Sequence, residues 1–401
     1  MTENHVRRRS VLGLPIAGLA AAGAAQVGPL VGPFLERAAA GSPSIIKPLP
    51  AAWFTDHGTN AETRWESVDP DRHLTPQSRL FVRNHTVTPV IDPDTYRLRI
   101  HGDGLVRAQG VSIGLRELRR RFRHVEVTSV HECTGNGRSF YDTQQGRKAS
   151  GTPWTLGAVG AVRWQGVRLR DVLAWAGVRR DAVSVQGAGL DPHHVDKGVD
   201  VGPVRRPFPI GKALDDALLA WGANGAPLLP DHGFPLRLVL PGWVGIASIK
   251  WLGDLEVSTS ELTSPWNAQW YNVGGPLGVN PVRSAWELPW DAQLPGARAL
   301  TLTGRSWSGA APIARVDVST DGGTTWSPAR LHPERGRGRG RRTSGHSWSQ
   351  WSHTWRSPRA GAHELLARAT DVRGRTQPDI AAYNPNGYFF DAVVRHPVTV
   401  V

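Results

Sequence analysis

The chain has 401 residues, a formal net charge of +13 at pH 7, 45 Gly, 31 Pro, 17 Trp and one Cys. This length exceeds what one hydrophobic core usually serves, so we expect two globular domains. The Gly and Pro content favours a turn-rich β or mixed architecture over a helical bundle. The lone Cys excludes an intramolecular disulfide, a CxxCH haem attachment and an Fe–S cluster held by four Cys of this chain.

Part of the positive charge is concentrated in two short segments, at 7–9 and in PERGRGRGRRTSGHS at 333–347. A basic balance is compatible with nucleic acid, anionic lipid, an acidic partner or an anionic substrate. No aromatic residues interleave with these charges and no nucleic-acid-binding motif occurs in the sequence. We therefore expect no nucleic-acid partner, and we expect 333–347 to be a disordered basic loop.

Residues 1–40 are typical of a twin-arginine signal peptide. Arg8 and Arg9 precede Ser-Val-Leu, no charge follows until Glu36, and Ala occupies 38–40 as a cleavage site. A retained anchor is the alternative, because the 26 uncharged residues at 10–35 are enough to span a bilayer. Several Pro and Gly residues weaken that alternative. We expect export of the folded protein to the periplasm or another extracytoplasmic site, with no stable membrane span after cleavage.

Residues 41–265 are expected to form a mixed α+β domain. Alternation of apolar and polar residues predicts strands at 80–85, 96–100, 124–130, 234–240 and 249–257. The segments 115–122 and 169–175 predict two short helices. Cys133 follows the strand at 124–130 in a Gly-rich loop, CTGNGR, and such strand ends usually present functional side chains.

Residues 266–285 are rich in Pro, Trp, Asn and Gly, which predicts a linker. Residues 286–401 then predict an all-β domain, with short strands at 300–304, 314–319, 348–355 and 364–370. Trp348, Trp351 and Trp355 are candidates for a stacking platform, but we expect them to pack in the core and at the interface of a β-sandwich. The predicted fold class is α+β, a mixed domain followed by a β-sandwich.

Four motifs carry the chemistry, and they occur in a fixed order. They are RNH at 83–85, CxGNxR at 133–138, DHGFPxR at 231–237 and SxKWLG at 248–253. With the twin-arginine signal, they resemble the sulfite oxidase family of molybdopterin enzymes over residues 45–395. The resemblance implies a molybdopterin-binding catalytic domain at 41–265 and an immunoglobulin-like dimerisation domain at 286–401, and therefore a homodimer.

The lone Cys suits a metal bound by an organic cofactor. A molybdenum centre needs a soft thiolate from the protein, and Cys133 is the only candidate in the chain. The alternative is a buried, inert thiol that packs as a small hydrophobic residue. The resemblance implies a molybdenum–molybdopterin cofactor with Cys133 as the metal ligand, and no haem or Fe–S cluster in this chain.

The resemblance also implies which residues bind the pyranopterin and its phosphate. Forked guanidinium groups, Lys and backbone N–H groups recognise phosphate, which suits Arg237 and Lys250, with a hydrogen bond from His232. Asp191 can accept hydrogen bonds from pterin N–H groups. For each residue alone, a salt bridge or a capped loop is the alternative. The predicted cofactor-binding residues are Phe81, Val82, Arg83, Asn84, His85, Cys133, Asp191, His232, Arg237, Ser248, Ile249 and Lys250.

The predicted substrate pocket contains Arg83, His85, Arg138, Trp154 and Tyr271. Arg83 and Arg138 match the family's anion-binding arginines and Tyr271 matches its active-site tyrosine, so with Cys133 they are the predicted catalytic residues. The resemblance implies oxygen-atom transfer to a small sulfur oxyanion, first of all sulfite oxidation to sulfate. The electrons are expected to pass to an external acceptor such as a c-type cytochrome.

Two positions depart from the sulfite-oxidising pattern. Asn386, in YNPNG at 383–387, stands where a third arginine is expected, and Gly137 replaces a basic residue. Removing a charge from a desolvated anion pocket costs about 2–5 kcal/mol. A larger or less charged sulfur substrate, as in sulfane dehydrogenase subunits, is therefore an alternative to sulfite.

Two further alternatives lie outside sulfur oxidation. An exported reductase of sulfoxides or N-oxides would share the lone Cys and the signal, but such enzymes generally lack the C-terminal β domain. A secreted β protein that binds polyanions or glycans through Trp and Arg is the non-enzymatic alternative. Molybdenum analysis of the purified protein separates this last alternative from the enzymes.

Overall fold

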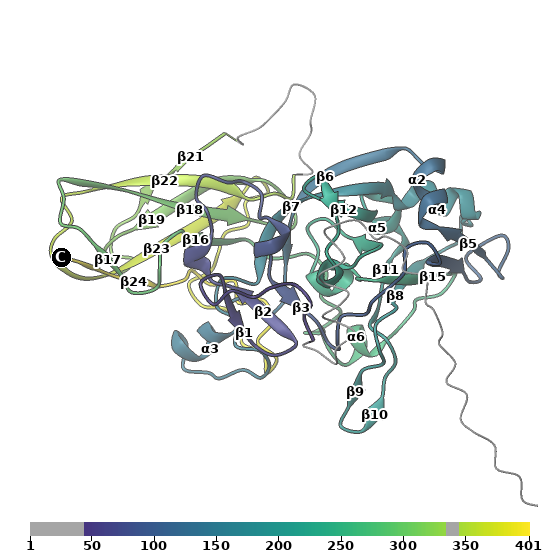
Figure 1. Cartoon of the computed structure of the whole chain (residues 1–401). Coiled ribbons are helices and arrows are strands. Elements are labelled where there is room, and N and C mark those ends of the chain that lie inside the picture. Colours follow the sequence, from purple (N-terminus) through teal and green to yellow (C-terminus); the bar gives the residue numbers. More distant parts are fainter. Residues whose placement is uncertain (1–43, 334–344) are drawn as a thin grey trace, which may run out of the picture.

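The computed structural model describes residues 44–333 and 345–401. The predicted signal peptide at 1–40 and most of the predicted basic loop, at 334–344, lie outside the described residues. We call residues 44–282 the first domain and residues 283–401 the second domain (Figure 1). In the described part of the chain, no helix is long and apolar enough to cross a membrane.

The first domain is built mainly from two five-stranded sheets. One sheet has the order β11-β8-β15-β4-β5, and the other runs β13-β12-β7-β6, with β14 paired to β12. A small sheet β1-β2-β3 and the hairpin β9-β10 complete the domain. The strands are β1 (Phe54–Asp56), β2 (Asn60–Thr63), β3 (Val82–Arg83), β4 (Arg97–His101), β5 (Val111–Gly114), β6 (His124–Glu132), β7 (Val159–Arg168), β8 (Ser184–Gly189), β9 (Val195–Asp196), β10 (Val199–Asp200), β11 (Arg205–Pro209), β12 (Leu218–Ala223), β13 (Ala226–Pro227), β14 (Arg237–Val239) and β15 (Leu252–Ser258).

Helices in the described residues are few and short. The α-helices are α2 (Leu115–Arg121), α3 (Ser139–Thr143), α4 (Leu169–Ala176), α5 (Ile210–Asp215) and α6 (Pro265–Ala268), and the 3-10 helices are η1 (Trp65–Ser67), η2 (Gln77–Arg79), η3 (Pro230–His232) and η4 (Gly245–Ala247). The structure confirms the helices expected at 115–122 and 169–175, and the strand expected at 124–130. Of the strand expected at 80–85, only β3 pairs, because the residues after it turn toward a cavity.

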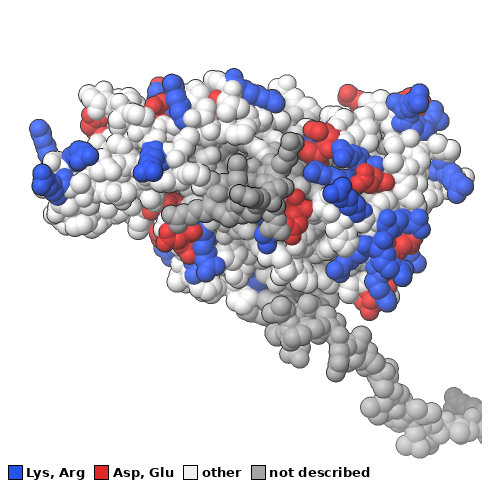
Figure 2. All heavy atoms as spheres, turned by 90° about the horizontal axis from the view of Figure 1, so that it is seen from above, with Lys and Arg blue, Asp and Glu red and all other residues white. Residues whose placement is uncertain are grey.

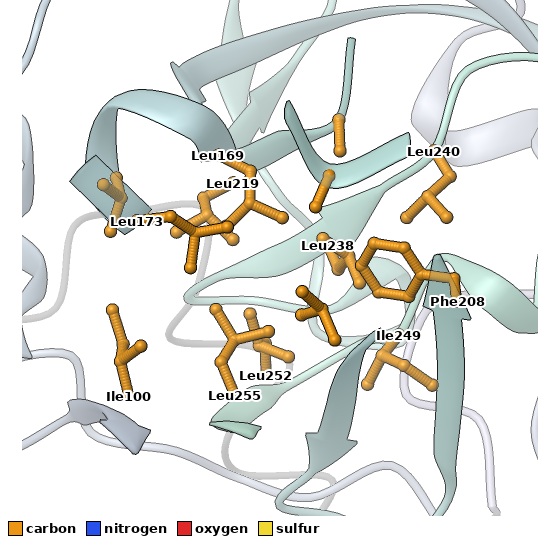
Figure 3. Packing of buried hydrophobic residues seen from close by; sticks show 14 of the residues in the cluster. Ile100, Leu169, Leu173, Phe208, Leu219, Leu238, Leu240, Ile249, Leu252 and Leu255 are labelled. Atoms are coloured by element: carbon orange, nitrogen blue, oxygen red, sulfur yellow. The ribbon is translucent and has the colours of Figure 1, made fainter. Parts of the chain in front are cut away.

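The core of the first domain lies between its two large sheets (Figure 3). Leu169 and Leu173, one turn apart on α4, are fully buried in the same cluster as Leu219 of β12 and Leu255 of β15. Burying a leucine side chain contributes about 1.5–3 kcal/mol to stability. Gly177 ends α4 in the left-handed conformation that a residue without Cβ adopts most easily. This core is the rigid support for the loops at the sheet ends.

The second domain is a β-sandwich in the described residues. Its sheets have the orders β16-β18-β22-β21 and β17-β24-β23-β19-β20, and one cluster that includes Trp286, Trp351 and Trp355 fills the space between them. Packing in this core is therefore confirmed for Trp351 and Trp355, whereas Trp348 lies in a cluster that also contains residues of the first domain. The strands are β16 (Arg283–Trp286), β17 (Ala292–Leu294), β18 (Ala299–Trp307), β19 (Ile313–Ser319), β20 (Ser327–Pro328), β21 (Arg330–Leu331), β22 (Ser349–Arg356), β23 (Gly361–Asp371) and β24 (His396–Val400).

The two domains share a hydrophobic core. Val130 and Phe140 of the first domain lie in one cluster with Trp307, Trp348 and Phe390 of the second. The segment expected to be a linker, 266–285, is also well packed, since Trp266, Tyr271 and Leu277 belong to the first core and β16 already begins at Arg283. The domain junction is therefore a buried interface, and the site described next lies beside it.

Candidate active site

Cys133 is presented by the end of β6, as its position in the sequence predicts. Its backbone N–H donates to Ala158 O at 2.9 Å, and its carbonyl accepts the N–H of Asn136 at 2.9 Å, which closes a tight turn. The residue is 7% exposed. Burial raises the pKa of the thiol, and the nearby positive charges of Arg83 and Arg138 oppose this effect. In the protein alone the thiol is therefore protonated at neutral pH.

The thiol lies at a cavity with about 710 Å³ of empty space, counting its open mouth. The cavity is lined by Phe81, Arg83, Asn84, His85, His131, Cys133, Thr134, Asp191, Val204, Asp231, His232, Arg237, Gly245, Ile246, Ser248, Ile249, Lys250, Trp251 and Tyr271. The structure thus brings together eleven of the twelve predicted cofactor-binding residues, all but Val82.

Buried cations surround the inner part of the cavity. Lys250 Nζ donates to Asp231 O at 2.9 Å and to Asn84 Oδ1, and Arg237 donates to the carbonyl oxygens of His232 and Ser248, each at 3.0 Å. Burial lowers the pKa of Lys250 to about 7 and that of Arg237 to about 9. Because desolvation is the largest cause of both shifts, these cations lack sufficient negative charge from the protein.

Behind this wall, Lys47 adds a third buried cation. Its Nζ donates to Gln77 O at 3.1 Å and lies 3.4 Å from His232 Nε2, and burial lowers its pKa to about 7. His232 Nε2 is itself 2.9 Å from Gln77 O. Burial, followed by the charge of Lys47, lowers the pKa of His232 well below its ordinary value, so its imidazole is neutral.

His131 is a cavity residue that the motifs did not predict. Its ring stacks on Phe81, with centroids 5.6 Å apart and 18° between the planes, and its Nε2 lies 3.3 Å from Arg237 Nη2. A signal for it exists, because His131 and Cys133 are two residues apart at the end of one strand and therefore share a face. Asp231 also lines the cavity and was not predicted, although it is the first residue of the DHGFPxR motif.

Three side chains form the neck between the cavity and a second, outer hollow. Arg83 Nη2 lies 3.0 Å from His85 Nε2 and 3.5 Å from the hydroxyl of Tyr271, and that hydroxyl lies 3.3 Å from His85 Nε2. Burial lowers the pKa of His85 and raises the pKa of Tyr271. The outer hollow has about 640 Å³ of empty space, counting its opening to solvent, and is lined by Thr59, Asn60, Arg83, Asn84, His85, His194, Asp196, Trp270, Tyr271 and Tyr388.

A buried arginine holds the loop that carries Tyr271. Arg206, on β11, is 1% exposed and donates to Trp266 O and, at 2.6 Å, to Leu277 O. These two carbonyls lie on either side of Tyr271, whose backbone has the uncommon φ of +52°. Arg206 therefore fixes both ends of a strained loop, and no motif in the sequence identified it.

Three predicted site residues do not line the cavity. Val82 packs in a separate cluster with Ile45, Phe54 and Ala61. Trp154 is fully buried behind Phe81, edge-on to its ring, with centroids 6.3 Å apart.

Arg138, the third, also lies behind the wall. It donates from Nε to Asn386 O at 2.8 Å and from Nη1 to Thr152 O at 2.7 Å. Asn386 belongs to the long loop between β23 and β24, so the second domain contacts the site through its backbone at this position.

The residues present fit a cofactor that carries both a metal and an anionic group. Among the described residues, no group of three or more His, Cys, Asp or Glu is placed to hold a metal ion. A metal bound by the Cys133 thiolate therefore needs further ligands from an organic cofactor. Lys250 and Arg237 offer unneutralised positive charge for a phosphate, and Arg237 Nε is buried without a hydrogen-bond partner.

Comparisons with known proteins agree with this fit. Residues 85–266 match the family model of the oxidoreductase molybdopterin binding domain, and residues 281–400 match that of the Mo-co oxidoreductase dimerisation domain. Sulfite oxidase of Gallus gallus is 36% identical over 346 residues, which cover 80% of this chain and 72% of that protein. Mitochondrial sulfite oxidase of Homo sapiens is 35% identical over 336 residues, which cover 78% of this chain and 58% of that protein.

A solved structure is similar over the same length. The sulfane dehydrogenase SoxCD from Paracoccus pantotrophus matches with a TM-score of 0.70 and 26% identity, over 86% of each chain. The fold and the site define a molybdopterin-dependent oxidoreductase. The chain belongs to the sulfite oxidase family.

Proposed function

We propose that this protein is an exported molybdenum-cofactor enzyme that oxidises a small sulfur oxyanion, sulfite first of all, to sulfate. The main observation behind this proposal is that one cavity is lined by the Cys133 thiol, the buried cations Arg237 and Lys250, and the neck residue Arg83. Relatives at 36% and 35% identity are sulfite oxidases, which supports this substrate class.

Each wall of the cavity has a distinct task in this proposal. The bound cofactor supplies two-electron chemistry at molybdenum, with the Cys133 thiolate as the one protein ligand. Arg237 and Lys250 bind its phosphate, which neutralises cations that the protein leaves unpaired. Asp191, whose pKa burial raises, accepts hydrogen bonds from the pterin. Ser248 also shapes the wall, since its Oγ accepts the N–H of Leu240 at 3.0 Å.

The neck residues bind and orient the substrate. Arg83 provides a permanent positive charge between the two hollows, where a sulfur oxyanion passes from solvent to the cofactor. The hydroxyl of Tyr271 donates a hydrogen bond to the bound anion, because its raised pKa keeps it protonated. His85 stays neutral at physiological pH and therefore adds a hydrogen bond rather than a second charge.

Sulfane oxidation is the second candidate. Asn386 replaces the expected third arginine, and the outer hollow contains the carboxylate of Asp196 and the rings of Trp270 and Tyr388. These surroundings suit a larger and less charged sulfur group than sulfite. The similarity to the sulfane dehydrogenase SoxCD supports this alternative.

A substrate panel with the purified molybdenum-loaded protein tests the proposal. Sulfite and thiosulfate are supplied with ferricyanide as acceptor, and methionine sulfoxide and trimethylamine N-oxide are supplied with a reduced viologen dye. Sulfite-dependent ferricyanide reduction, abolished in Arg83→Met, is the expected result. Activity with thiosulfate alone favours the sulfane candidate, and turnover only in the viologen assay contradicts sulfur oxidation.

The proposal includes an external electron acceptor. Figure 2 shows many basic side chains, with some acidic ones among them, at the end formed by the first domain. Helix α2 lies at this end (Figure 1), and its Arg116, Arg119 and Arg120 are exposed. We propose that this end attracts an acidic c-type cytochrome, whose reduction rate then falls as salt rises. A rate that is independent of salt contradicts this docking.

Two measurements test the remaining parts. We propose cleavage after residue 40 and a homodimer through the second domain, which matches the dimerisation-domain model. N-terminal sequencing of the exported protein and light scattering of the purified protein check these points. A retained N-terminus or a monomer at micromolar concentration contradicts them. The immunoglobulin-like character of the second domain likewise remains our proposal.

A further inference from the structure

A buried ion pair between the two domains lies directly behind Cys133. Glu132, the last residue of β6, is 1% exposed, and Arg283, the first residue of β16, is 4% exposed. Arg283 Nη1 lies 3.0 Å from Glu132 Oε1 and donates to Asn136 O at 2.7 Å. Trp307 of β18 donates its Nε1 to the other carboxylate oxygen at 2.9 Å. Two side chains of the second domain thus engage the residue next to the cysteine.

The same carboxylate shapes the loop that follows Cys133. Asn136 Nδ2 donates to Glu132 Oε1 at 2.9 Å, and Asn136 Oδ1 accepts the N–H of Ala158 at 3.1 Å. Ala158 O in turn accepts the N–H of Cys133. The hydrogen-bonded chain from Arg283 through Glu132 and Asn136 therefore reaches the backbone on both sides of the thiol.

Gly137 reveals how closely Arg283 fits this loop. Its φ is +82°, and a Cβ built on it would lie 2.4 Å from Arg283 Nη2. That nitrogen is buried and has no hydrogen-bond partner. The guanidinium therefore occupies the space that a side chain at 137 would need, and Gly137 is required for this arrangement. A basic residue is expected at 137. Here Arg283 of the second domain places its positive charge beside Gly137 instead.

We propose that Arg283 is a positioning residue, through which the second domain sets the shape of the Cys133 loop and the direction of its thiol. The carboxylate of Glu132 compensates the buried guanidinium, and removing one partner of such a pair leaves the other charge uncompensated. The consequence for catalysis rests on the proposed function, in which this thiol binds molybdenum. The consequence for the loop does not, and it is measurable in the cofactor-free protein.

The test uses the mature full-length protein and its single thiol. Iodoacetamide alkylation of the cofactor-free protein reports on Cys133 alone. Arg283→Lys keeps the charge but loses the planar guanidinium, whose Nη1 contacts both Glu132 and Asn136 and whose Nη2 fills the space beside Gly137. We expect it to change the alkylation rate by about tenfold, the equivalent of 1.4 kcal/mol. In the loaded enzyme we expect an altered Mo(V) electron paramagnetic resonance signal, which depends on the orientation of the thiolate.

Arg305→Lys is the matched control. Arg305 forms a buried ion pair with Glu287, with side chains 1% and 2% exposed against 4% and 2% in the Arg283–Glu132 pair. Arg305 also donates to Asp69 O of the first domain at 2.6 Å, so it too joins the domains, but it has no contact with the Cys133 loop. We expect Arg305→Lys to lower stability and to leave the alkylation rate and the Mo(V) signal unchanged.

Unchanged alkylation and Mo(V) signals in Arg283→Lys overturn the inference, and equal changes in both variants do so as well. If Arg283→Lys does not fold, Trp307→Phe removes one hydrogen bond to Glu132 and keeps an aromatic ring in the core. A smaller shift in the same direction is then expected, and no shift overturns the inference. A wild-type protein without molybdenum contradicts the proposed function instead, and it leaves the alkylation comparison valid.

Discussion

Tyr388 of the second domain stacks on Tyr271 of the first, with ring centroids 5.0 Å apart and 19° between the planes. Asn384 holds Tyr388 from both sides, since it accepts the N–H of Tyr388 at 2.9 Å and donates to its carbonyl at 2.8 Å. The two domains are also joined by the ion pair between Arg283 and Glu132, the residue that precedes Cys133. The site therefore depends on both domains, although the cavity wall comes from the first.

Tyr271→Phe removes the hydroxyl that lies 3.5 Å from Arg83 and 3.3 Å from His85. Hydrogen bonds to charged groups contribute about 1.5–3 kcal/mol, so we expect kcat/KM for sulfite to fall about 10- to 100-fold. Steady-state kinetics with ferricyanide measure this. Tyr388→Phe keeps the stacked ring and is the control, with kcat/KM close to wild type. A Tyr271→Phe variant with the wild-type kcat/KM would show that the Tyr271 hydroxyl does not contact the substrate.

Arg206→Lys replaces two fixed hydrogen bonds to the Tyr271 loop with a single flexible amine. We expect kcat/KM for sulfite to fall about tenfold, since small displacements of a substrate-positioning group are costly. If Arg206 acts through Tyr271, the double variant with Tyr271→Phe loses little more than Tyr271→Phe alone. Fully additive losses in this double-mutant cycle contradict the positioning role.

The buried lysines predict how the stability of the cofactor-free protein depends on pH. The pKa of Lys250 and that of Lys47 are both lowered from 10.5 to about 7 by burial. Above pH 7 the unfolded chain therefore binds more protons than the folded protein, so the free energy of unfolding rises with pH. We expect higher stability at pH 9 than at pH 7 in urea titrations.

Two comparisons sharpen the pH measurement. Lys250→Met should reduce the rise, because one of the two lysines no longer titrates. The loaded protein should also show a smaller rise, since a phosphate bound in the cavity keeps Lys250 protonated. A flat or falling profile in the cofactor-free wild type contradicts the burial of uncompensated lysines.

Asn386→Arg tests the departure from the sulfite-oxidising pattern. Asn386 lies beside Arg138, which donates to its carbonyl oxygen. An added guanidinium at this position increases the positive charge near the neck, and we expect KM for sulfite to fall about tenfold, the equivalent of 1.4 kcal/mol. Asn386→Gln, which adds no charge, is the control. A rise in KM with the arginine alone would show that the site is built for a less charged substrate.

The sequence predicts those parts of the structure that depend on local pattern. The alternation in HVEVTSV places Cys133 at a strand end, and helices α2 and α4 follow from short apolar repeats. The motifs also predict most of the cavity wall, because residues such as Arg237 and Lys250 lie within the short motifs DHGFPxR and SxKWLG. His131 was missed although it shares a strand face with Cys133.

Other features depend on tertiary contacts that no local pattern reports. Arg206 and Arg283 belong to no motif that the sequence shows, and only the fold brings them to the Tyr271 and Cys133 loops. The segment 266–285 has the composition of a linker, but Trp266 and Leu277 are buried in the first core. Arg138 belongs to the CxGNxR motif of Cys133 and yet lies behind the cavity wall, because backbone carbonyls satisfy its guanidinium.

The central claim is that Cys133 supplies the protein's ligand to molybdenum. Molybdenum K-edge X-ray absorption of wild type and Cys133→Ser, each with its metal content determined, tests it most directly. The account predicts about one molybdenum per wild-type chain, and one fewer sulfur neighbour of the metal in whatever molybdenum the variant retains. An unchanged sulfur count in a molybdenum-loaded Cys133→Ser protein would contradict it.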